Sequence, residues 1–181
     1  MTTKDSYGIV QHNINVSRLS EAYARELRLS EEQCQVIAVA GVFLDLGKIA
    51  MDFKVFTKLG TLTEEEFFYI KQHASKSTQL LIQSNLISKD ILSCIIHHHE
   101  SYDGSGYPSK VKGETIPLGA RILKICDVYL ALLEARTYRD HYSHMDAINI
   151  MLDEKQIYDP ELIDKFIPFI NKYESDKRKK G

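Results

Sequence analysis

Apolar residues recur at helical spacing along most of the chain, and long stretches of alternating apolar and polar residues are missing. No Asn-Gly or Asp-Gly turn joins two β-branched stretches. The pattern therefore predicts an all-α fold. Its helices are expected over residues 7–27, 30–46, 63–83, 88–100, 118–136, 143 onward and 160–173.

Several predicted helix starts carry residues that cap a helix. Ser30 is followed three residues later by Gln33, and Thr63 by Glu66, so both positions are predicted capping boxes. Gly47 is expected to close the second helix, because glycine readily adopts the backbone conformation that ends one.

The longer segments outside this helical pattern are a linker over residues 48–62, an internal loop and the C-terminal tail. Residues 101–119 are rich in Gly, Pro and Ser, which predicts a structured loop. With 181 residues, the chain has the length of one domain. We expect that domain over residues 1–174, followed by a disordered basic tail over residues 175–181.

Composition excludes several classes of function. The 23 basic and 25 acidic residues give a net charge of -2, so no basic field favours a nucleic acid polymer or an anionic membrane. The N-terminal segment lacks a signal-peptide core, and no apolar stretch reaches the length of a membrane helix. The three cysteines lack paired spacing, which is typical of buried thiols in a reducing compartment. We therefore expect a cytoplasmic protein.

Two aspartates interrupt apolar helical stretches. Asp45 lies in VIAVAGVFLDLGK and Asp127 in ILKICDVYLALL. A buried carboxylate needs a compensating partner. Taken singly, each is explained by a buried ion pair or a helix cap, but nearby histidines would favour a metal site instead.

Three consecutive histidines, His97, His98 and His99, end the fourth predicted helix. Successive helical side chains are about 100° apart, so two adjacent imidazoles can converge on one point while the third faces elsewhere. The alternative is a polar helix end whose cationic side chains interact with the helix dipole. Because three histidines in a row are rare in ordinary packing, we favour convergence.

The other histidines are weaker signals by themselves. His12, in IVQHNIN, and His73, in YIKQHASK, each stand alone in a helical segment, where a surface or core role is the ordinary explanation. His141 and His144 lie in a polar segment and receive no role.

Imidazoles and carboxylates without cysteine suit iron, manganese, zinc or nickel, whereas calcium prefers oxygen ligands alone. A carboxylate between two ligand helices can bridge two ions, an arrangement used in phosphoester hydrolysis. Spacing alone leaves open an all-α di-iron protein that handles oxygen.

A set of motifs along the chain separates these alternatives. They are LDLGK (44–48), KLGTLTEEE (58–66), IKQH (70–73), HHESYDGSGYP (98–108), IPLGARILKICDVYLAL (116–132) and ARTYR (135–139). With these motifs the chain resembles the HD-GYP family of bacterial cyclic di-GMP phosphodiesterases over about 160 residues, in the family order. HHESYDGSGYP is the most specific of them. The resemblance implies an HD-domain bundle of about seven helices.

The resemblance also implies a ligand set for one or two transition-metal ions, with iron or manganese expected first and zinc or nickel as alternatives. Asp45 would bridge the two ions. The histidine that opens the family's HD pair is replaced by Leu44, which cannot coordinate, so uneven occupation of the two positions is expected. The implied ligands are His12, Asp45, His73, His98, His99 and Asp127.

The substrate side of the motif set is better preserved. The resemblance implies catalytic roles for Asp45 and Lys48, with Lys48 also contacting a substrate phosphate. Arg136 and Arg139, one turn apart on a predicted helix, would grip phosphate oxygens, although a basic helix end explains them as well. Tyr107 would donate to a phosphate, stack on guanine, or anchor its loop to the bundle.

The function expected from the resemblance is hydrolysis of cyclic di-GMP. A degenerate module that binds cyclic di-GMP, or a protein partner through the GYP loop, is the alternative that Leu44 favours. A phosphohydrolase acting on another nucleotide is a third possibility, against which the DGSGYP loop argues.

Overall fold

The structure, a computed structural model, describes residues 3–56, 58, 60–134 and 141–180. Within those residues all regular structure is helical, which confirms the predicted all-α fold. Four short 3-10 helices are η1 (Leu46–Ala50), η2 (Phe53–Val55), η3 (Gly113–Thr115) and η4 (Lys155–Ile157). The α-helices are α1 (Thr3–Glu26), α2 (Glu31–Phe43), α3 (Glu64–Lys71), α4 (His73–Ile82), α5 (Lys89–His97), α6 (Leu118–Leu133), α7 (His144–Asp153) and α8 (Pro160–Lys180).

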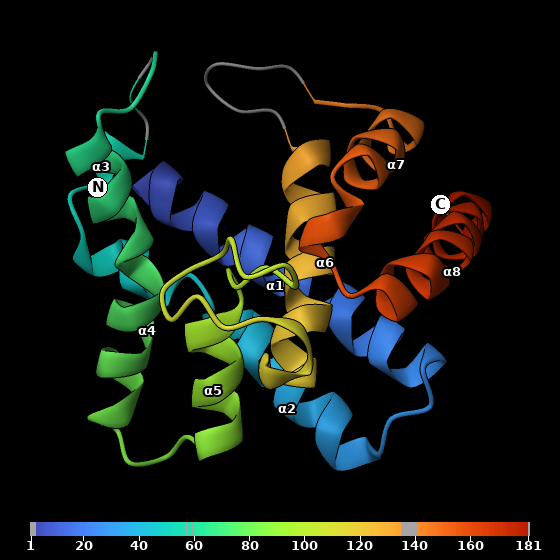
Figure 1. Ribbon diagram of the computed structural model, residues 1–181, viewed down its shortest axis with the longest axis horizontal. Helices are drawn as coiled ribbons and strands as arrows, with labels where there is room; N and C mark the ends of the chain where they lie inside the picture. Colours follow the sequence, from blue (N-terminus) through green and yellow to red (C-terminus); the bar gives the residue numbers. More distant parts are fainter. Residues whose placement is uncertain (1–2, 57, 59, 135–140, 181) are drawn as a thin grey trace.

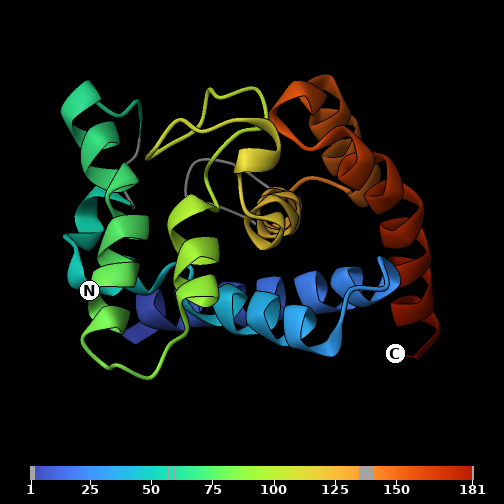
Figure 2. The ribbon, with the colours of Figure 1, turned by 60° about the horizontal axis from the view of Figure 1, so that its bottom comes forward.

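Helix α6 forms the centre of the bundle and is seen end-on in Figure 2. It packs against α1, α2, α5, α7 and α8. Helices α3 to α5 lie on one side of it and α7 and α8 on the other, with the two termini at opposite ends of the molecule (Figure 1). Apolar side chains of α6 such as Ile122, Leu123 and Ile125 are fully buried in the main core. Burying this apolar surface is the dominant stabilisation of the fold.

The two predicted capping boxes are confirmed, but Gly47 does not close the second helix, because that helix ends at Phe43 and Gly47 lies inside η1. Ser30 and Thr63 each form a full capping box, with Gln33 and Glu66 respectively as the reciprocating residue. The side chain of Ser88 caps α5 in the same way, by accepting a hydrogen bond from a first-turn amide. Each cap pairs backbone N–H groups that have no partner inside the helix.

The single helix predicted over residues 63–83 is wrong, because it is divided at Gln72 into α3 and α4. The imidazole Nδ1 of His73 donates to the carbonyl oxygen of Ile70, 2.8 Å away. In an uninterrupted helix that oxygen would accept from the amide of residue 74. The side chain of His73 therefore takes the place of a backbone donor at the point where the helix divides.

The second helix ends earlier than predicted, at Phe43 instead of Leu46. The chain then turns through Asp45 into η1, which passes close to α4. Ser77 of α4 holds this turn, since its Oγ donates to the carbonyl of Leu44 at 2.9 Å and accepts from the amide of Gly47 at 2.7 Å. A Cβ on Gly47 would overlap the backbone of α4, so the close approach requires glycine.

Two predictions about helix ends also need correction. Helix α6 ends at Leu133, before the predicted end at Arg136, because Glu134 has an extended backbone. Helix α8 continues to Lys180, so residues 175–180 are helical and not the disordered tail that was predicted. The tail's basic residues pair with acidic residues one turn before them: Lys177 with Glu174 at 3.4 Å and Lys179 with Asp176 at 3.6 Å.

The segment Glu31–Ala50 has the length and mean hydropathy, 1.4, of a membrane span. In the structure it is α2 followed by η1, and α2 packs against α1, α5 and α6. An apolar helix face packed against three other helices accounts for this hydropathy, and 39% of the segment is buried. The cysteines Cys34, Cys94 and Cys126 are buried and free, as predicted.

Candidate metal centre

Three imidazoles from two parts of the chain meet inside the bundle. His73 begins α4, whereas His98 and His99 directly follow α5. The Nε2 atom of His73 lies 3.4 Å from Nε2 of His98 and 3.0 Å from Nε2 of His99. One ligand atom from each residue lies within 4.8 Å of the others. We call these residues the histidine cluster.

Backbone hydrogen bonds fix the tautomers of two imidazoles in the cluster. Nδ1 of His73 donates to the carbonyl of Ile70 at 2.8 Å, and Nδ1 of His98 donates to that of Ile95 at 2.6 Å. In the neutral ring the proton is then on Nδ1, which leaves the Nε2 lone pair free. Two lone pairs facing each other at 3.4 Å repel unless a cation lies between them. The donor set of the histidine cluster therefore fits a metal ion.

Burial keeps these imidazoles neutral. It lowers the pKa of His73 to about 4, despite the opposing charge of Asp45. Burial likewise lowers the pKa of His98, and it lowers that of His99 well below the ordinary value, with the neighbouring imidazoles adding to the effect. Neutral imidazole is the form that binds a metal, so the cluster is in its ligand state at neutral pH.

Asp45 lies beside the histidine cluster, at the turn between α2 and η1. Its Oδ1 lies 3.3 Å from Nε2 of His73, and its Oδ2 accepts from Nζ of Lys48 at 2.6 Å. Burial alone would raise the pKa of Asp45, but the Lys48 charge and then the imidazoles lower it further than burial raises it. Asp45 is therefore an ionised carboxylate, suited to share a cation with His73.

His12 and Asp127 form a second group together with Glu134, a residue that the sequence did not single out. Nε2 of His12 lies 2.8 Å from Oδ1 of Asp127, and its Nδ1 lies 2.9 Å from Oε1 of Glu134. Burial lowers the pKa of His12, yet the hydrogen bonds to these two carboxylates outweigh it and raise the value to about 10. His12 is thus an imidazolium between two carboxylates at neutral pH.

The loop that carries Tyr107 covers the histidine cluster. The Tyr107 ring stacks on that of His99, with 4.7 Å between centroids, and its amide donates to the His99 carbonyl at 3.3 Å. Nζ of Lys71 lies 5.2 Å from the Tyr107 centroid. These contacts favour anchoring the loop over stacking on guanine, since a stacking neighbour is already present.

Two buried charges under this loop were not found from the sequence. Glu100 accepts from the amides of Ser109 and Lys110 through one carboxylate oxygen, at 2.6 and 3.1 Å, which holds the loop in place. Nζ of Lys124, in α6, donates to the carbonyl of His99 at 3.4 Å. The sequence offered a signal for Lys124, because a lysine interrupts the apolar stretch ILKIC. For Glu134, which contacts His12, the available signal was its spacing of two helical turns after Asp127.

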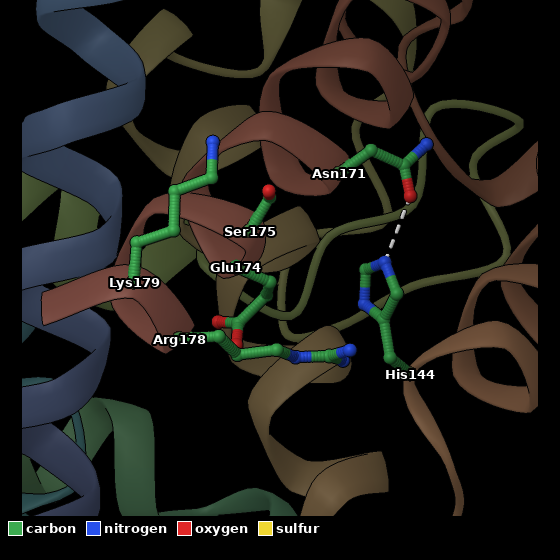
Figure 3. A pocket seen from close by; sticks show the side chains of 6 residues that line it. All are labelled: His144, Asn171, Glu174, Ser175, Arg178 and Lys179. Carbon is green, nitrogen blue, oxygen red and sulfur yellow. Dashed lines mark hydrogen bonds between the residues drawn. The ribbon is translucent and has the colours of Figure 1, made fainter. Parts of the chain in front are cut away.

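The remaining predicted positions lie outside the histidine cluster. Nδ1 of His97 donates to the carbonyl of Ser93 at 2.9 Å, so it is the member of the triple that faces elsewhere. His144 lines a pocket of about 310 Å³ between α7 and α8, where its ring donates to Asn171 at 2.8 Å (Figure 3). Arg136 and Arg139 lie outside the residues that the structure describes.

Comparison with known proteins decides the family. A sequence model of the family described as "HD domain" matches residues 3–162. The chain is a member of the HD-domain family. Curated relatives confirm the resemblance to its HD-GYP branch. This HD domain is 31% identical over 96% of its length to "Cyclic di-GMP phosphodiesterase PA4108" of Pseudomonas aeruginosa, of which 42% is covered.

A second relative is "Cyclic di-GMP phosphodiesterase response regulator RpfG" of Xanthomonas campestris, 37% identical over 84% of this chain and 41% of the relative. The HD domain therefore spans about two fifths of the length of these relatives. Among solved structures, Bd1817, an HDG"Y"P protein from Bdellovibrio bacteriovorus, matches with a TM-score of 0.74 and 18% identity, over 90% of this chain and 52% of that one. That match shows the fold.

Proposed function

We propose that this HD domain is a metal-dependent phosphodiesterase that hydrolyses cyclic di-GMP. One observation carries the proposal: the neutral imidazoles of the histidine cluster converge beside the ionised Asp45, beneath the loop that carries Tyr107. The activities named for the similar proteins PA4108 and RpfG support the choice of substrate.

His73, His98 and His99, joined by Asp45, would hold the ion. A nitrogen-rich set with one carboxylate suits iron or manganese, with zinc or nickel as alternatives. A bound ion of this kind supplies Lewis-acid stabilisation of the charge that develops on a phosphodiester.

Two side chains beside the histidine cluster would act on the substrate. The Lys48 side chain is 24% exposed and is held in place by Asp45, so its ammonium group can meet a phosphate oxygen from the solvent side. Burial raises the pKa of the Tyr107 phenol, and the charges of Asp127 and Asp45 add to this. Tyr107 thus keeps its proton and can donate it in a hydrogen bond to a phosphate oxygen. Phosphate binding by Arg136 and Arg139 remains a prediction from the resemblance.

The test uses the purified full chain, loaded anaerobically with Fe²⁺ or with Mn²⁺, and measures cyclic di-GMP hydrolysis by chromatography. We expect turnover, with a loss of about 100-fold or more in His99→Gln, because one of the imidazole ligands is removed. His97→Gln is the matched control and should keep its activity, because His97 faces away from the cluster.

Binding of cyclic di-GMP without hydrolysis would contradict the proposal and establish the inactive binding module instead. Equal losses in His97→Gln and His99→Gln would contradict the role given to the histidine cluster. Faster hydrolysis of cyclic di-AMP or of the mixed cyclic GMP-AMP would mean that the substrate is a different cyclic dinucleotide. The proposed reaction class would then still stand.

A further inference from the structure

We propose that this HD domain holds a single metal ion, at the histidine cluster, and that its own side chains close the position of a second ion. The second position is the one that the resemblance assigns to His12 and Asp127. The inference rests on the metal role proposed for the histidine cluster and is independent of the substrate.

The first closing element is Leu44, which by the resemblance takes the place of the histidine that opens the family's HD pair. Leu44 is fully buried and belongs to the main hydrophobic core. Its carbonyl accepts from Ser77 Oγ at 2.9 Å, which fixes the backbone on the core side of the turn. An aliphatic side chain in this place supplies no lone pair, so the second position lacks one of its nitrogen ligands.

The second closing element is the contact of His12 with two carboxylates. Both ring nitrogens are engaged, Nε2 with Asp127 at 2.8 Å and Nδ1 with Glu134 at 2.9 Å. A ligand imidazole needs one nitrogen directed at the ion and uses the other for an orienting hydrogen bond. Here the nitrogen that would face the ion contacts a carboxylate oxygen directly. Asp127 is compensated by His12 in the same contact.

The third closing element is the ammonium group of Lys48. A carboxylate that bridges two ions gives one oxygen to each of them. In Asp45, Oδ1 faces His73 at 3.3 Å, whereas Oδ2 is bound by Lys48 Nζ at 2.6 Å. The oxygen that would reach a second ion is thus paired with a fixed cation, while the oxygen facing the cluster is available.

The two positions therefore differ in their donors. Within the described part of the chain, the histidine cluster is the group of His, Cys, Asp and Glu whose ligand atoms lie close enough to share an ion. His12, Asp127 and Glu134 do not form such a group, because the two carboxylates contact opposite nitrogens of one ring. Two internal basic groups, Lys48 and His12, take the contacts that a second ion would need.

Metal counting tests this directly. Metal-free full chain is reconstituted anaerobically with excess Mn²⁺ or Fe²⁺, dialysed to equilibrium, and its metal measured per chain by mass spectrometry. We expect one ion per chain in the wild type, one in His12→Gln and Asp127→Asn, and none retained in His99→Gln. Circular dichroism of each variant confirms that it is folded. The electron paramagnetic resonance spectrum of the Mn²⁺ form should be that of an isolated ion.

Two ions per chain, or the spectrum of a magnetically coupled pair, would overturn the single-ion inference and leave the proposed function standing. Loss of the ion in folded His12→Gln would also overturn it, because His12 would then be a ligand. No bound metal in the wild type would contradict both this inference and the proposed function.

Discussion

The histidine cluster and His12 place the same side chain in two buried surroundings, with opposite results. In the cluster, imidazoles meet other imidazoles and donate to backbone carbonyls, and burial lowers the pKa of His73 to about 4. His12 meets two carboxylates, which overcome burial and raise its pKa to about 10. The comparison teaches that the partner of a buried imidazole, more than its burial, decides whether it is a metal ligand or a cation.

The strongest change that we expect is a wide separation of the pKa values of His73 and His12 in the metal-free protein. Nuclear magnetic resonance of the imidazole protons should show His73 titrating near 4 and His12 near 10, on either side of the ordinary value of 6.5. His73 takes up a proton more easily when unfolded, so its contribution lowers stability as pH falls from 6.5 towards 4. His12 holds its proton more tightly when folded, so its stabilisation is complete below pH 6.5 and is lost as pH rises towards 10.

Urea unfolding across pH checks the two signs separately. His12→Gln should remove the loss of stability on the alkaline side, and His73→Gln should reduce the loss on the acid side. If both histidines titrated near 6.5, the two environments would not shift the imidazole pKa in opposite directions, and the comparison would be wrong.

A second, smaller effect concerns the backbone near the histidine cluster and near His12. Gly47→Ala should destabilise the protein by about 3 kcal/mol or more, because the new Cβ would overlap the carbonyl of His73. Gly8→Ala, in α1 near His12, is the matched control. Nothing lies within 4 Å of its added Cβ, so it should stabilise the helix by about 0.5–1 kcal/mol. Thermal unfolding measures both, and equal effects would show that the turn carrying Asp45 does not depend on its close approach to α4.

The smallest effect distinguishes the two carboxylates that hold His12. The Asp127 side chain is 13% exposed and that of Glu134 is 41% exposed, so water screens the second contact more. Asp127→Asn should cost about 2 kcal/mol of unfolding free energy, whereas Glu134→Gln should cost about 0.5 kcal/mol. Both should lower the pKa of His12 without changing that of His73. A larger cost for Glu134→Gln would mean that Glu134 is the main partner of His12.

Much of the fold follows from short stretches of sequence. The capping boxes at Ser30 and Thr63 were predicted because such a cap involves residues within three positions of one another. The division at Gln72 was missed because it depends on where one side chain turns, and apolar periodicity continues across it. The end of α8 was missed because ion pairs along the helix offset the repulsion within its basic run.

Part of the candidate site could also be predicted from a short stretch of sequence. The triple histidine and helical geometry predicted that two of its imidazoles converge, and the structure shows that these are His98 and His99. The sequence did not reveal Glu134 as a partner of His12, since residues 122 positions apart carry no mutual signal in one chain. It also could not show that Lys48 pairs with Asp45, because a motif gives residue order and not the direction of a side chain.

The sequence by itself determined the all-α class, most helix starts and the family, because these depend on neighbouring residues and on a specific motif. Only the tertiary structure decided which nitrogen of His73 and of His98 is free, and that His12 lies between carboxylates while His73 lies among imidazoles. The physical reason is that protonation follows the local electrostatic environment, which contacts between distant segments create.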